Sequence, residues 1–266
     1  MKQSRGSPAA GKEEPGARRF AWLRRWTDPL WVQIVLLIAA VLFIRHFLLA
    51  AFSIPSGSME NTLLIGDYLM ANKAIYGAPI PLTPWRTPAF RQPRFQDIVV
   101  FRPGYNQPVI DVVKRIIGVP ADTVAMRAGV VYRNGERLRE PYVHDQGIPD
   151  GAIAYSGRQV ALSPGVDPES YGYHWHLDHL PAGVEAESYR PSRENWGPLV
   201  VPEGEYLLLG DNRDQSLDSR YVGFIGRDEI VGRPMFIYYS IDKSADRPFP
   251  RLLTAVRWGR IGDLIR

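Results

Sequence analysis

Cysteine is absent from the sequence, which excludes disulfide bonds, thiolate metal sites and a cysteine nucleophile. The chain also lacks a P-loop, a GxGxxG segment after a strand-like run and an HExxH motif. These absences remove the usual signatures of nucleotide hydrolysis, dinucleotide binding and zinc-dependent proteolysis. Serine chemistry and carboxylate chemistry remain as the catalytic possibilities.

Net charge is absent from most of the chain. Residues 1–29 carry seven basic and three acidic side chains, which accounts for the whole net charge of +4. The 32 basic and 28 acidic residues of the chain therefore leave 25 of each sign after residue 29. A nucleic-acid-binding domain would carry a basic patch on its folded body, so we expect no nucleic-acid partner.

One long apolar run stands near the N-terminus. Leu30–Ile44 reads LWVQIVLLIAAVLFI, and after Arg45-His46 the run resumes as FLLAAF over Phe47–Phe52. The first part alone spans about 22 Å, less than the hydrocarbon core of about 30 Å, whereas both parts together are long enough. We predict a transmembrane signal-anchor helix over residues 30–50, with the lipid bilayer as a partner.

The basic leader of residues 1–29 predicts that the N-terminus is cytoplasmic and that the large C-terminal body lies across the membrane. Trp22, Trp26 and Trp31 stand where an interfacial aromatic belt is expected. Two alternatives remain open. The small residues Ala50-Ala51 would suit a cleaved signal peptide, and the run could instead be a buried core helix.

After this run the sequence predicts a mainly β fold. Glycine and proline together make up 47 of 266 residues, which indicates many turns. Asn134-Gly135 is a strong hairpin signal, and long periodic helices are absent. Apolar, β-branched or aromatic runs predict strands over Ile98–Phe101, Val109–Ile117, Val130–Tyr132, Glu205–Leu209 and Met235–Tyr239.

Composition divides the body further. We predict a catalytic β domain over residues 51–142 and 196–250, interrupted by an insertion subdomain over 143–195 that is rich in Pro, Gly, Ser, Asp, Tyr and His. His174–His179 (HWHLDH) has ligand types that suit zinc, but the spacing favours an exposed aromatic loop. The basic tail, residues 251–266, is either an amphipathic helix at the membrane surface or a packed terminal element.

Three segments could carry serine chemistry. The first, Ser53–Met59 (SIPSGSM), directly follows the apolar run, although clustered serines beside Pro and Gly are ordinarily loop residues. A serine nucleophile needs a base. Histidine is the usual base, but none of the five histidines lies in a well-defined core element; they are His46, His144, His174, His176 and His179.

Lysine is the other possible base, and the chain has only five. Lys114 lies in the second segment, where a strand period of two places Ile110, Val112 and Ile116 on the same face. Apolar neighbours desolvate an ammonium group and lower its pKa, as a lysine base requires. The alternative is a lysine that reaches solvent from an edge strand.

The third segment is Gly210–Tyr221 (GDNRDQSLDSRY), dense in side chains that form hydrogen-bonded loops, with a solvated turn as the alternative. In this order, the three segments resemble those of bacterial type I signal peptidases, membrane-anchored endopeptidases with a Ser–Lys dyad. The matching stretches are SIPSGSMENTLLIGDYLMANKAIYG (Ser53–Gly77), DIVVFRP with VIDVVKRIIGVPADTV (Asp97–Val124), GVVYRNGERLREPY (Gly129–Tyr142) and GDNRDQSLDSRYVGF (Gly210–Phe224).

The resemblance implies a role for each matching residue. Ser58 matches the nucleophile and Lys114 its general base. Ser56 matches the hydroxyl that, with the backbone N–H of Ser58, forms the oxyanion hole. Ser216 matches the hydroxyl that orients the lysine amine, and Asp218 and Arg220 match a supporting ion pair. The residues that match the substrate cleft are Phe52, Ile54, Pro55, Met59, Leu63, Val112, Val113 and Leu217.

The resemblance also implies a β-ribbon catalytic domain behind a single transmembrane helix, with no metal or cofactor. Such enzymes cleave signal peptides from exported preproteins, after small residues at positions −1 and −3, through an acyl-enzyme. The implied location is the bacterial inner (cell) membrane, with the catalytic domain on the periplasmic or extracytoplasmic side. The substrate is expected to bind as an added β-strand.

Two positions depart from the family pattern. Asn61 replaces the proline of Met-x-Pro-Thr, and we expect a looser loop; Leu217 replaces a smaller residue and would narrow the side-chain pocket. Three other interpretations remain. The neutral body opposes a self-cleaving repressor, and the presence of Ser56, Ser58, Lys114 and Ser216 opposes a non-catalytic binding protein. A specialised peptidase that serves one substrate stays open.

Overall fold

The computed structural model describes residues 29–83, 85–104, 110–143, 174–242 and 254–266. Contacts divide the chain into two units, Met1–His46 and Phe47–Arg266. Helix α2 (Leu30–Phe43) continues as a π-helical turn (Ile44–Leu48), so that 19 residues are helical and the apolar side chains on them are not buried. At 1.5 Å per residue this helix measures about 28 Å, which by length and composition suffices to cross a membrane.

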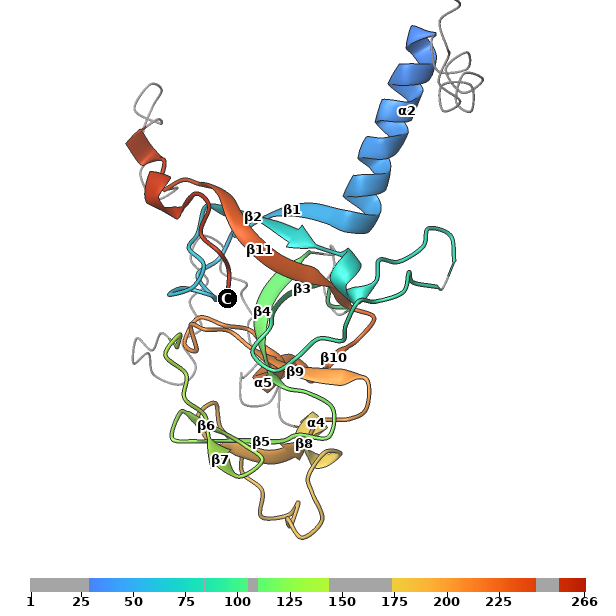
Figure 1. Cartoon of the computed structure of the whole chain (residues 1–266). Helices are drawn as coiled ribbons and strands as arrows, with labels where there is room; N and C mark the ends of the chain where they lie inside the picture. Colours follow the sequence, from blue (N-terminus) through green and yellow to red (C-terminus); the bar gives the residue numbers. More distant parts are fainter. Residues whose placement is uncertain (1–28, 84, 105–109, 144–173, 243–253) are drawn as a thin grey trace, which may run out of the picture. The chain divides into compact units, whose positions relative to one another are not determined.

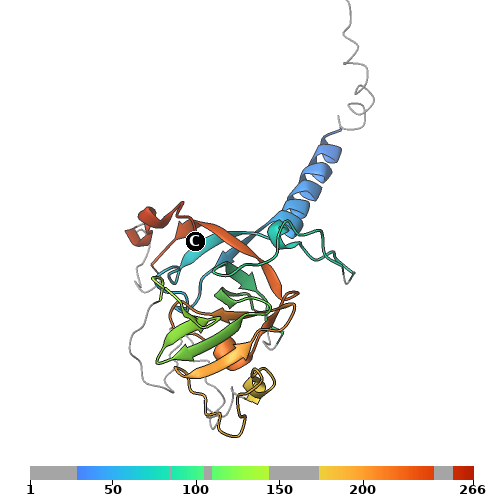
Figure 2. The ribbon, with the colours of Figure 1, turned by 60° about the horizontal axis from the view of Figure 1, so that its bottom comes forward.

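The body consists of two antiparallel sheets (Figures 1 and 2). The larger sheet has the order β1-β2-β11-β3-β4-β9-β10. Its strands are β1 (Leu49–Ser53), β2 (Asp67–Asn72), β3 (Ile98–Phe101), β4 (Val112–Gly118), β9 (Glu205–Leu209), β10 (Ile225–Gly226) and β11 (Ile230–Ser240). The smaller sheet, in the order β7-β6-β5-β8, contains β5 (Thr123–Arg127), β6 (Val130–Arg133), β7 (Glu136–Arg137) and β8 (Trp196–Val200). The described helices of the body are short: η2 (Ala74–Tyr76), α4 (His174–Leu177), α5 (Ser219–Val222) and η4 (Trp258–Arg260).

The predicted mainly β class is confirmed, and strands β3, β4, β6, β9 and β11 overlap the predicted runs. The hairpin at Asn134-Gly135 is also confirmed, because both residues have positive φ (53° and 83°) between β6 and β7. Strands β1, β2, β5, β8 and β10 were missed. Leu49 and Ala50 were assigned to the membrane segment, but they pair with Asn72 and Ala71 of β2, so the helix ends two residues earlier.

Strand β4 is held from both sides and on both faces. It lies between β3 and β9, and its side chains enter three separate apolar clusters. Val113 belongs to cluster I (Ile54, Met59, Leu63, Leu69, Ala71, Ile98, Val100, Val113, Ile237, Ile265). Ile117 belongs to cluster II (Ile117, Val124, Met126, Val131, Trp196, Leu199, Val201, Leu207, Leu209). Ile116 belongs to cluster III (Tyr76, Val99, Phe101, Ile116, Tyr206, Leu208, Ile225, Ile230). A strand packed in this way gives Lys114 a fixed position.

The described part of the C-terminal tail, residues 254–266, is packed against the large sheet. Ile265 is buried in cluster I, and Leu264 forms a β-bridge with Phe236. The Arg260 guanidinium binds the buried carboxylate of Asp67 at 2.6 Å. Of the two alternatives for the tail, these residues form the packed terminal element, which includes the short helical turn η4.

Residues 144–173 of the predicted insertion lie outside the described residues, but His174–His179 does not form the exposed aromatic loop that we predicted. His176 is fully buried, and the Trp175 ring lies 5.0 Å from that of Phe224. Tyr189 accepts the backbone N–H of Gly197 at 2.7 Å, and its hydroxyl forms a hydrogen bond of 2.8 Å with His176 Nδ1. Among the described residues, no group of three or more His, Cys, Asp or Glu is arranged to hold a metal ion.

His176 should make stability fall in acid. Burial, with a smaller effect of the nearby His179, lowers the pKa of His176 to about 3. The unfolded chain binds this proton near pH 6.5, so this group should cost about 1.4 kcal/mol per pH unit as pH falls between these values. His176→Asn retains a side chain that can hydrogen-bond with Tyr189 but cannot titrate. We therefore expect its melting temperature to decline less steeply below pH 6.5 than that of the wild type.

The matched control is His174→Asn, because His174 is exposed. Its melting temperature should follow the wild-type slope when the full chain is scanned in detergent between pH 7.5 and 4. An unchanged slope in His176→Asn would show that the buried imidazole does not carry this pH dependence.

Candidate active site

The first and second predicted segments meet at one hydrogen bond. Ser58 lies in the loop between β1 and β2, where Met59 and Leu63 anchor the turn in cluster I and the N–H of Leu63 donates to the Met59 carbonyl at 2.7 Å. Lys114 projects from the centre of β4. Its Nζ lies 2.7 Å from Oγ of Ser58, and both side chains are buried. The fold thus joins two residues that stand 56 positions apart.

The environment of Lys114 lowers the pKa of its amine. The residue is 1% exposed, and burial is the main cause that lowers the pKa of Lys114 to about 8. The charges of Asp218 and Asp211 oppose this effect, and the charge of Arg220 adds to it. The alternative of a lysine on an edge strand is wrong, because Lys114 pairs with Val99 of β3 and the next residue pairs with Leu209 of β9.

The prediction of which residues neighbour Lys114 is confirmed in part. Val112 and Ile116 both pack with cluster III, as the period of a strand requires. Ile110 lies before the first residue of β4 and is 53% exposed, so it contributes nothing to the burial of the amine.

Ser56 lies beside the candidate nucleophile, with its Oγ 3.5 Å from Oγ of Ser58. The carbonyl of Ser58 accepts the backbone N–H of Asn212 at 3.1 Å, which joins the serine loop to the third predicted segment. The two serine hydroxyls therefore face a common region next to the amine of Lys114.

The segment Gly210–Tyr221 is a buried loop rather than a solvated turn. Arg220 binds Asp218 through two hydrogen bonds, Nε to Oδ1 at 2.8 Å and Nη2 to Oδ2 at 2.9 Å. Asp218 also accepts the backbone N–H of Gly210 at 3.0 Å and caps helix α5 through the N–H of Arg220. Burial alone would raise the pKa of Asp218, but the charge and hydrogen bonds of Arg220 and Gly210 hold it below its ordinary value.

Ser216 is buried next to the serine loop. A Cβ on Gly210 would lie 2.2 Å from Ser216 Oγ and 2.6 Å from the carbonyl oxygen of Ser58, so all three groups are in close contact. Among the described residues, no hydrogen bond joins Ser216 to Lys114, and the predicted orienting role of Ser216 stays a prediction.

A second buried ion pair was missed by the sequence analysis. Arg115 binds Asp211 through Nε–Oδ1 (2.8 Å) and Nη2–Oδ2 (2.7 Å), and both side chains are less than 5% exposed. Thr62 donates to the same carboxylate at 2.5 Å, and the Tyr142 ring lies 3.9 Å from the guanidinium. An arginine inside the apolar run VVKRII was the available signal, since such a residue needs a buried partner.

Most of the predicted cleft residues lie in or against cluster I, including Met59 next to Ser58, and several are buried. Ile54, Met59, Leu63 and Val113 belong to cluster I, and Phe52 packs against that cluster. Val112 packs against cluster III, Leu217 is half-buried and Pro55 is exposed. A bound peptide would therefore meet mainly the rim of this cluster in the present conformation.

Asn61 takes a conformation that proline cannot adopt. Its φ is 86°, whereas a proline ring requires about −65°. The side-chain amide donates to the carbonyls of Tyr142 and Val143, each at 3.4 Å. The departure from the family pattern thus replaces a rigid residue by one that contacts a neighbouring segment.

Comparisons with known proteins identify the family. The family model described as signal peptidase, peptidase S26, matches residues 26–239. Signal peptidase I of Rickettsia massiliae is 34% identical over 220 residues, with 79% of each chain covered. Signal peptidase I of Aquifex aeolicus is 32% identical over 225 residues, covering 79% of this chain and 83% of the relative. The Pseudomonas aeruginosa enzyme of that name is 31% identical over 235 residues, covering 84% and 74%.

A crystal structure of a signal peptidase I from Enterococcus faecalis covers 54% of this chain and 97% of its own, with 31% identity and a TM-score of 0.32. The chain belongs to the signal peptidase family, peptidase S26. It is accordingly a peptidase whose reaction is the cleavage of signal peptides, and the resemblance found in the sequence is confirmed.

Gly210→Ala should abolish most activity. The added Cβ would meet Ser216 Oγ and the backbone oxygen of Ser58, so at least one of the two serines must move. A displacement of about 1 Å in such a site costs on the order of a hundredfold in turnover. We expect that loss in a signal-peptide cleavage assay, with the secondary structure retained by circular dichroism.

Gly259→Ala is the matched control, because a Cβ at Gly259 meets nothing within 4 Å. Its turnover should equal that of the wild type. Full activity in Gly210→Ala would show that the close contact of the two loops is not needed for catalysis.

Proposed function

We propose that this chain is a membrane-anchored serine endopeptidase that removes signal peptides from exported preproteins through a Ser58–Lys114 dyad. The observation that carries the proposal is the 2.7 Å contact between Ser58 Oγ and Nζ of a fully buried Lys114. A serine hydroxyl is a weak nucleophile until a base removes its proton, and a buried neutral amine next to it is such a base.

The lowered pKa gives this base its protonation state. With a pKa of about 8, roughly a tenth of the molecules carry a neutral Lys114 at pH 7. For a lysine of ordinary pKa the neutral share would be roughly 3 in 10,000. Burial therefore increases the population of the active form by about 300-fold.

The reaction divides into two steps. In the first, Ser58 Oγ attacks the scissile carbonyl while Lys114 takes the hydroxyl proton and then passes it to the leaving amine. The acyl group remains on Ser58, and the new N-terminus of the mature protein departs. In the second, Lys114 removes a proton from water, which hydrolyses the ester and restores the serine. The Ser58 N–H and the Ser56 hydroxyl would bind the oxyanion in both steps.

The pairing of β4 supports the binding of substrate as an added strand. Its N-terminal half pairs with β3 through Val112, Val113 and Lys114, whereas the pairing with β9 begins only at Arg115. The β9 side of residues 112–114 therefore has backbone groups that the described strands do not pair. An extended peptide placed there would bring a carbonyl next to Ser58, and main-chain hydrogen bonds would bind it without regard to most side chains.

The helix Leu30–Leu48 supports membrane anchoring. Ser58 follows the last helical residue by ten positions, so the chain can extend at most about 36 Å between them. We place the leader in the cytoplasm and the catalytic body on the periplasmic or extracytoplasmic side of the bacterial inner (cell) membrane. Small residues at −1 and −3 are expected, with Leu217 narrowing the pocket, and no metal or cofactor takes part.

Substitution of either dyad residue should abolish cleavage. In detergent, the wild type should cut a preprotein with an Ala-x-Ala site after the second alanine, whereas Ser58→Ala and Lys114→Ala should be inert. Lys114→Arg should also be inert, because a guanidinium stays protonated and cannot act as a base. The readout is the mass of the mature product.

Ser53→Ala and Lys73→Arg serve as controls of the same type outside the site, and both should retain wild-type turnover. Retained cleavage in Lys114→Arg would exclude the lysine as the base. An inert wild type with several preproteins would favour the specialised peptidase instead.

Activity should rise with pH. The neutral form of Lys114 increases as pH passes through its pKa of about 8, so kcat/KM should climb about tenfold per pH unit below this value and level off above it. The measurement is kcat/KM of the detergent-solubilised enzyme from pH 5 to 10. A flat profile from pH 5 to 9 is incompatible with a lysine base.

A further inference from the structure

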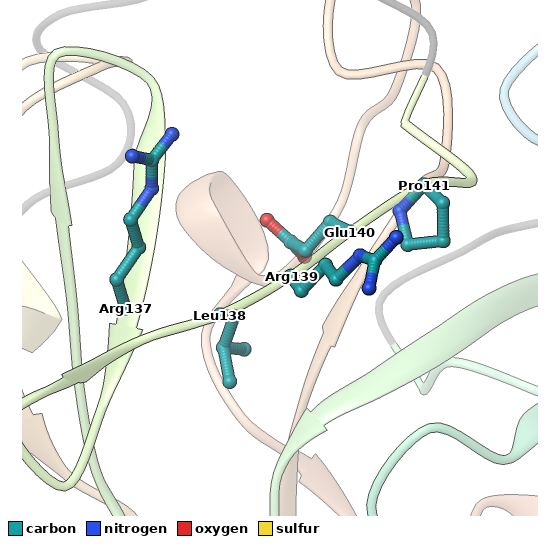
Figure 3. Close-up of a pocket in the computed structure, with 5 residues that line it drawn as sticks. All are labelled: Arg137, Leu138, Arg139, Glu140 and Pro141. Carbon is teal, nitrogen blue, oxygen red and sulfur yellow. The ribbon is translucent and has the colours of Figure 1, made fainter.

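A short segment that leaves the small sheet contacts both loops of the site. We name residues 138–143 (LREPYV) the strap; Leu138–Pro141, together with Arg137, line a hollow of about 350 Å³ (Figure 3). Resting on the Ser58–Lys114 function above, we propose that Glu140 of the strap is a positioning residue that holds the Gly210–Tyr221 loop, through Arg213, against the loop that carries Ser58.

The contact with the Gly210–Tyr221 loop is a buried ion pair. Glu140 Oε1 accepts Nη2 of Arg213 at 2.5 Å, and the two side chains are 9% and 8% exposed. Nε of Arg213 donates to the carbonyl of Gly210 at 3.1 Å, and the carbonyl of Arg213 accepts Nη2 of Arg220 at 2.7 Å. Arg213 therefore connects Glu140 with Gly210 and with the Asp218–Arg220 pair.

The contact with the serine loop runs through Tyr142. The Tyr142 hydroxyl donates to Glu140 Oε1 at 3.1 Å, so the same carboxylate oxygen serves both loops. The Tyr142 ring stacks on the Arg115 guanidinium, and the Tyr142 carbonyl accepts the amide of Asn61, three residues after Ser58. One carboxylate is thus the common partner of Arg213, which lies in the Gly210–Tyr221 loop, and of Tyr142, which contacts the serine loop.

Gly210 transmits the position of Arg213 to the reacting groups. Its Cα lies so close to Ser216 Oγ and to the carbonyl oxygen of Ser58 that no Cβ fits. A shift of Gly210 must therefore move one of these two serines or open the packing that covers Lys114. A substitution of Glu140 therefore alters the positions of the reacting groups, although Glu140 itself does not contact the substrate.

The burial of this pair indicates a role in geometry more than in stability. The desolvation of two buried charges offsets most of their attraction, so such pairs add little net stability. What they do supply is one defined arrangement, because each partner left alone would be an uncompensated buried charge. The two carboxylate partners of Arg213 and Arg220 thus specify how the Gly210–Tyr221 loop is folded.

The test is Glu140→Gln, which keeps the side-chain shape and removes the charge. We expect kcat to fall about tenfold while KM stays within about twofold of the wild type, because positioning and not binding is lost. We also expect the acid limb of the pH profile, which is the rise of kcat/KM below the pKa of Lys114, to move to higher pH. A loosened loop admits water to Lys114, which Asp218, Asp211 and Arg220 also face, and loss of desolvation raises its pKa.

Glu136→Gln is the matched control, because Glu136 is an exposed glutamate on the preceding strand. It should leave kcat, KM and the acid limb unchanged. Tyr142→Phe, which removes one hydrogen bond to Glu140 and keeps the stacked ring, should change kcat and the acid limb in the same direction by a smaller factor. The double variant Glu140→Arg with Arg213→Glu restores an ion pair with the charges exchanged. It should therefore recover part of the kcat that is lost when the pair is broken.

The proposal is overturned if folded Glu140→Gln, measured by near-UV circular dichroism, has wild-type kcat and an unmoved acid limb. If Glu140→Gln does not fold, the proposal is tested with Glu140→Asp, by its kcat and by the acid limb of its pH profile. Ser58→Ala in the same assay separates the two proposals. If Ser58→Ala is active, the dyad fails; if it is inert and Glu140→Gln equals the wild type, only the positioning role fails.

Discussion

The exclusion of water from one lysine amine is the constraint on which the rest of the site depends. Lys114 lies in the middle of the large sheet, between β3 and β9, and its strand sends side chains into three apolar clusters. In this position Lys114 is 1% exposed, so the amine is largely withdrawn from bulk solvent. The pKa of the amine is therefore a property of the fold, and the hydroxyl of Ser58 is the polar partner placed within hydrogen-bonding distance of it.

Buried carboxylates near Lys114 would normally stabilise its charged form. Here each of the two that act on the amine has its own arginine, because Asp218 binds Arg220 and Asp211 binds Arg115. A third pair, Glu140 with Arg213, also involves the Gly210–Tyr221 loop. Because every acid is matched by a cation, the attraction for the ammonium is reduced and desolvation remains the largest effect on its pKa. The same three pairs connect β4, the Gly210–Tyr221 loop and the strap, so electrostatic balance and positional order come from one set of contacts.

The order of the chain adds a further constraint. The helix Leu30–Leu48 is followed immediately by β1, and the loop with Ser58 follows β1. The proposed nucleophile is therefore close in sequence to a membrane-length helix, which suits substrates that are themselves anchored by an apolar segment. The C-terminal residues reinforce this region, since Ile265 enters cluster I together with Met59 and Leu63.

The sequence alone was enough for the features that depend on local pattern. The apolar run, the mainly β class and the Asn134-Gly135 hairpin follow from residue order and periodicity. The same patterns left the three segments of the site as candidates, and the resemblance to signal peptidases assigned their roles. The tertiary structure decided what depends on distant partners. That β4 is central rather than an edge strand, that Arg115 meets Asp211 from 96 residues away and that Glu140 joins two loops all follow from strand order and packing. The local sequence pattern indicates which side chains share a face of a strand. The burial of a side chain and the identity of its ion-pair partner are determined only when the whole chain has folded.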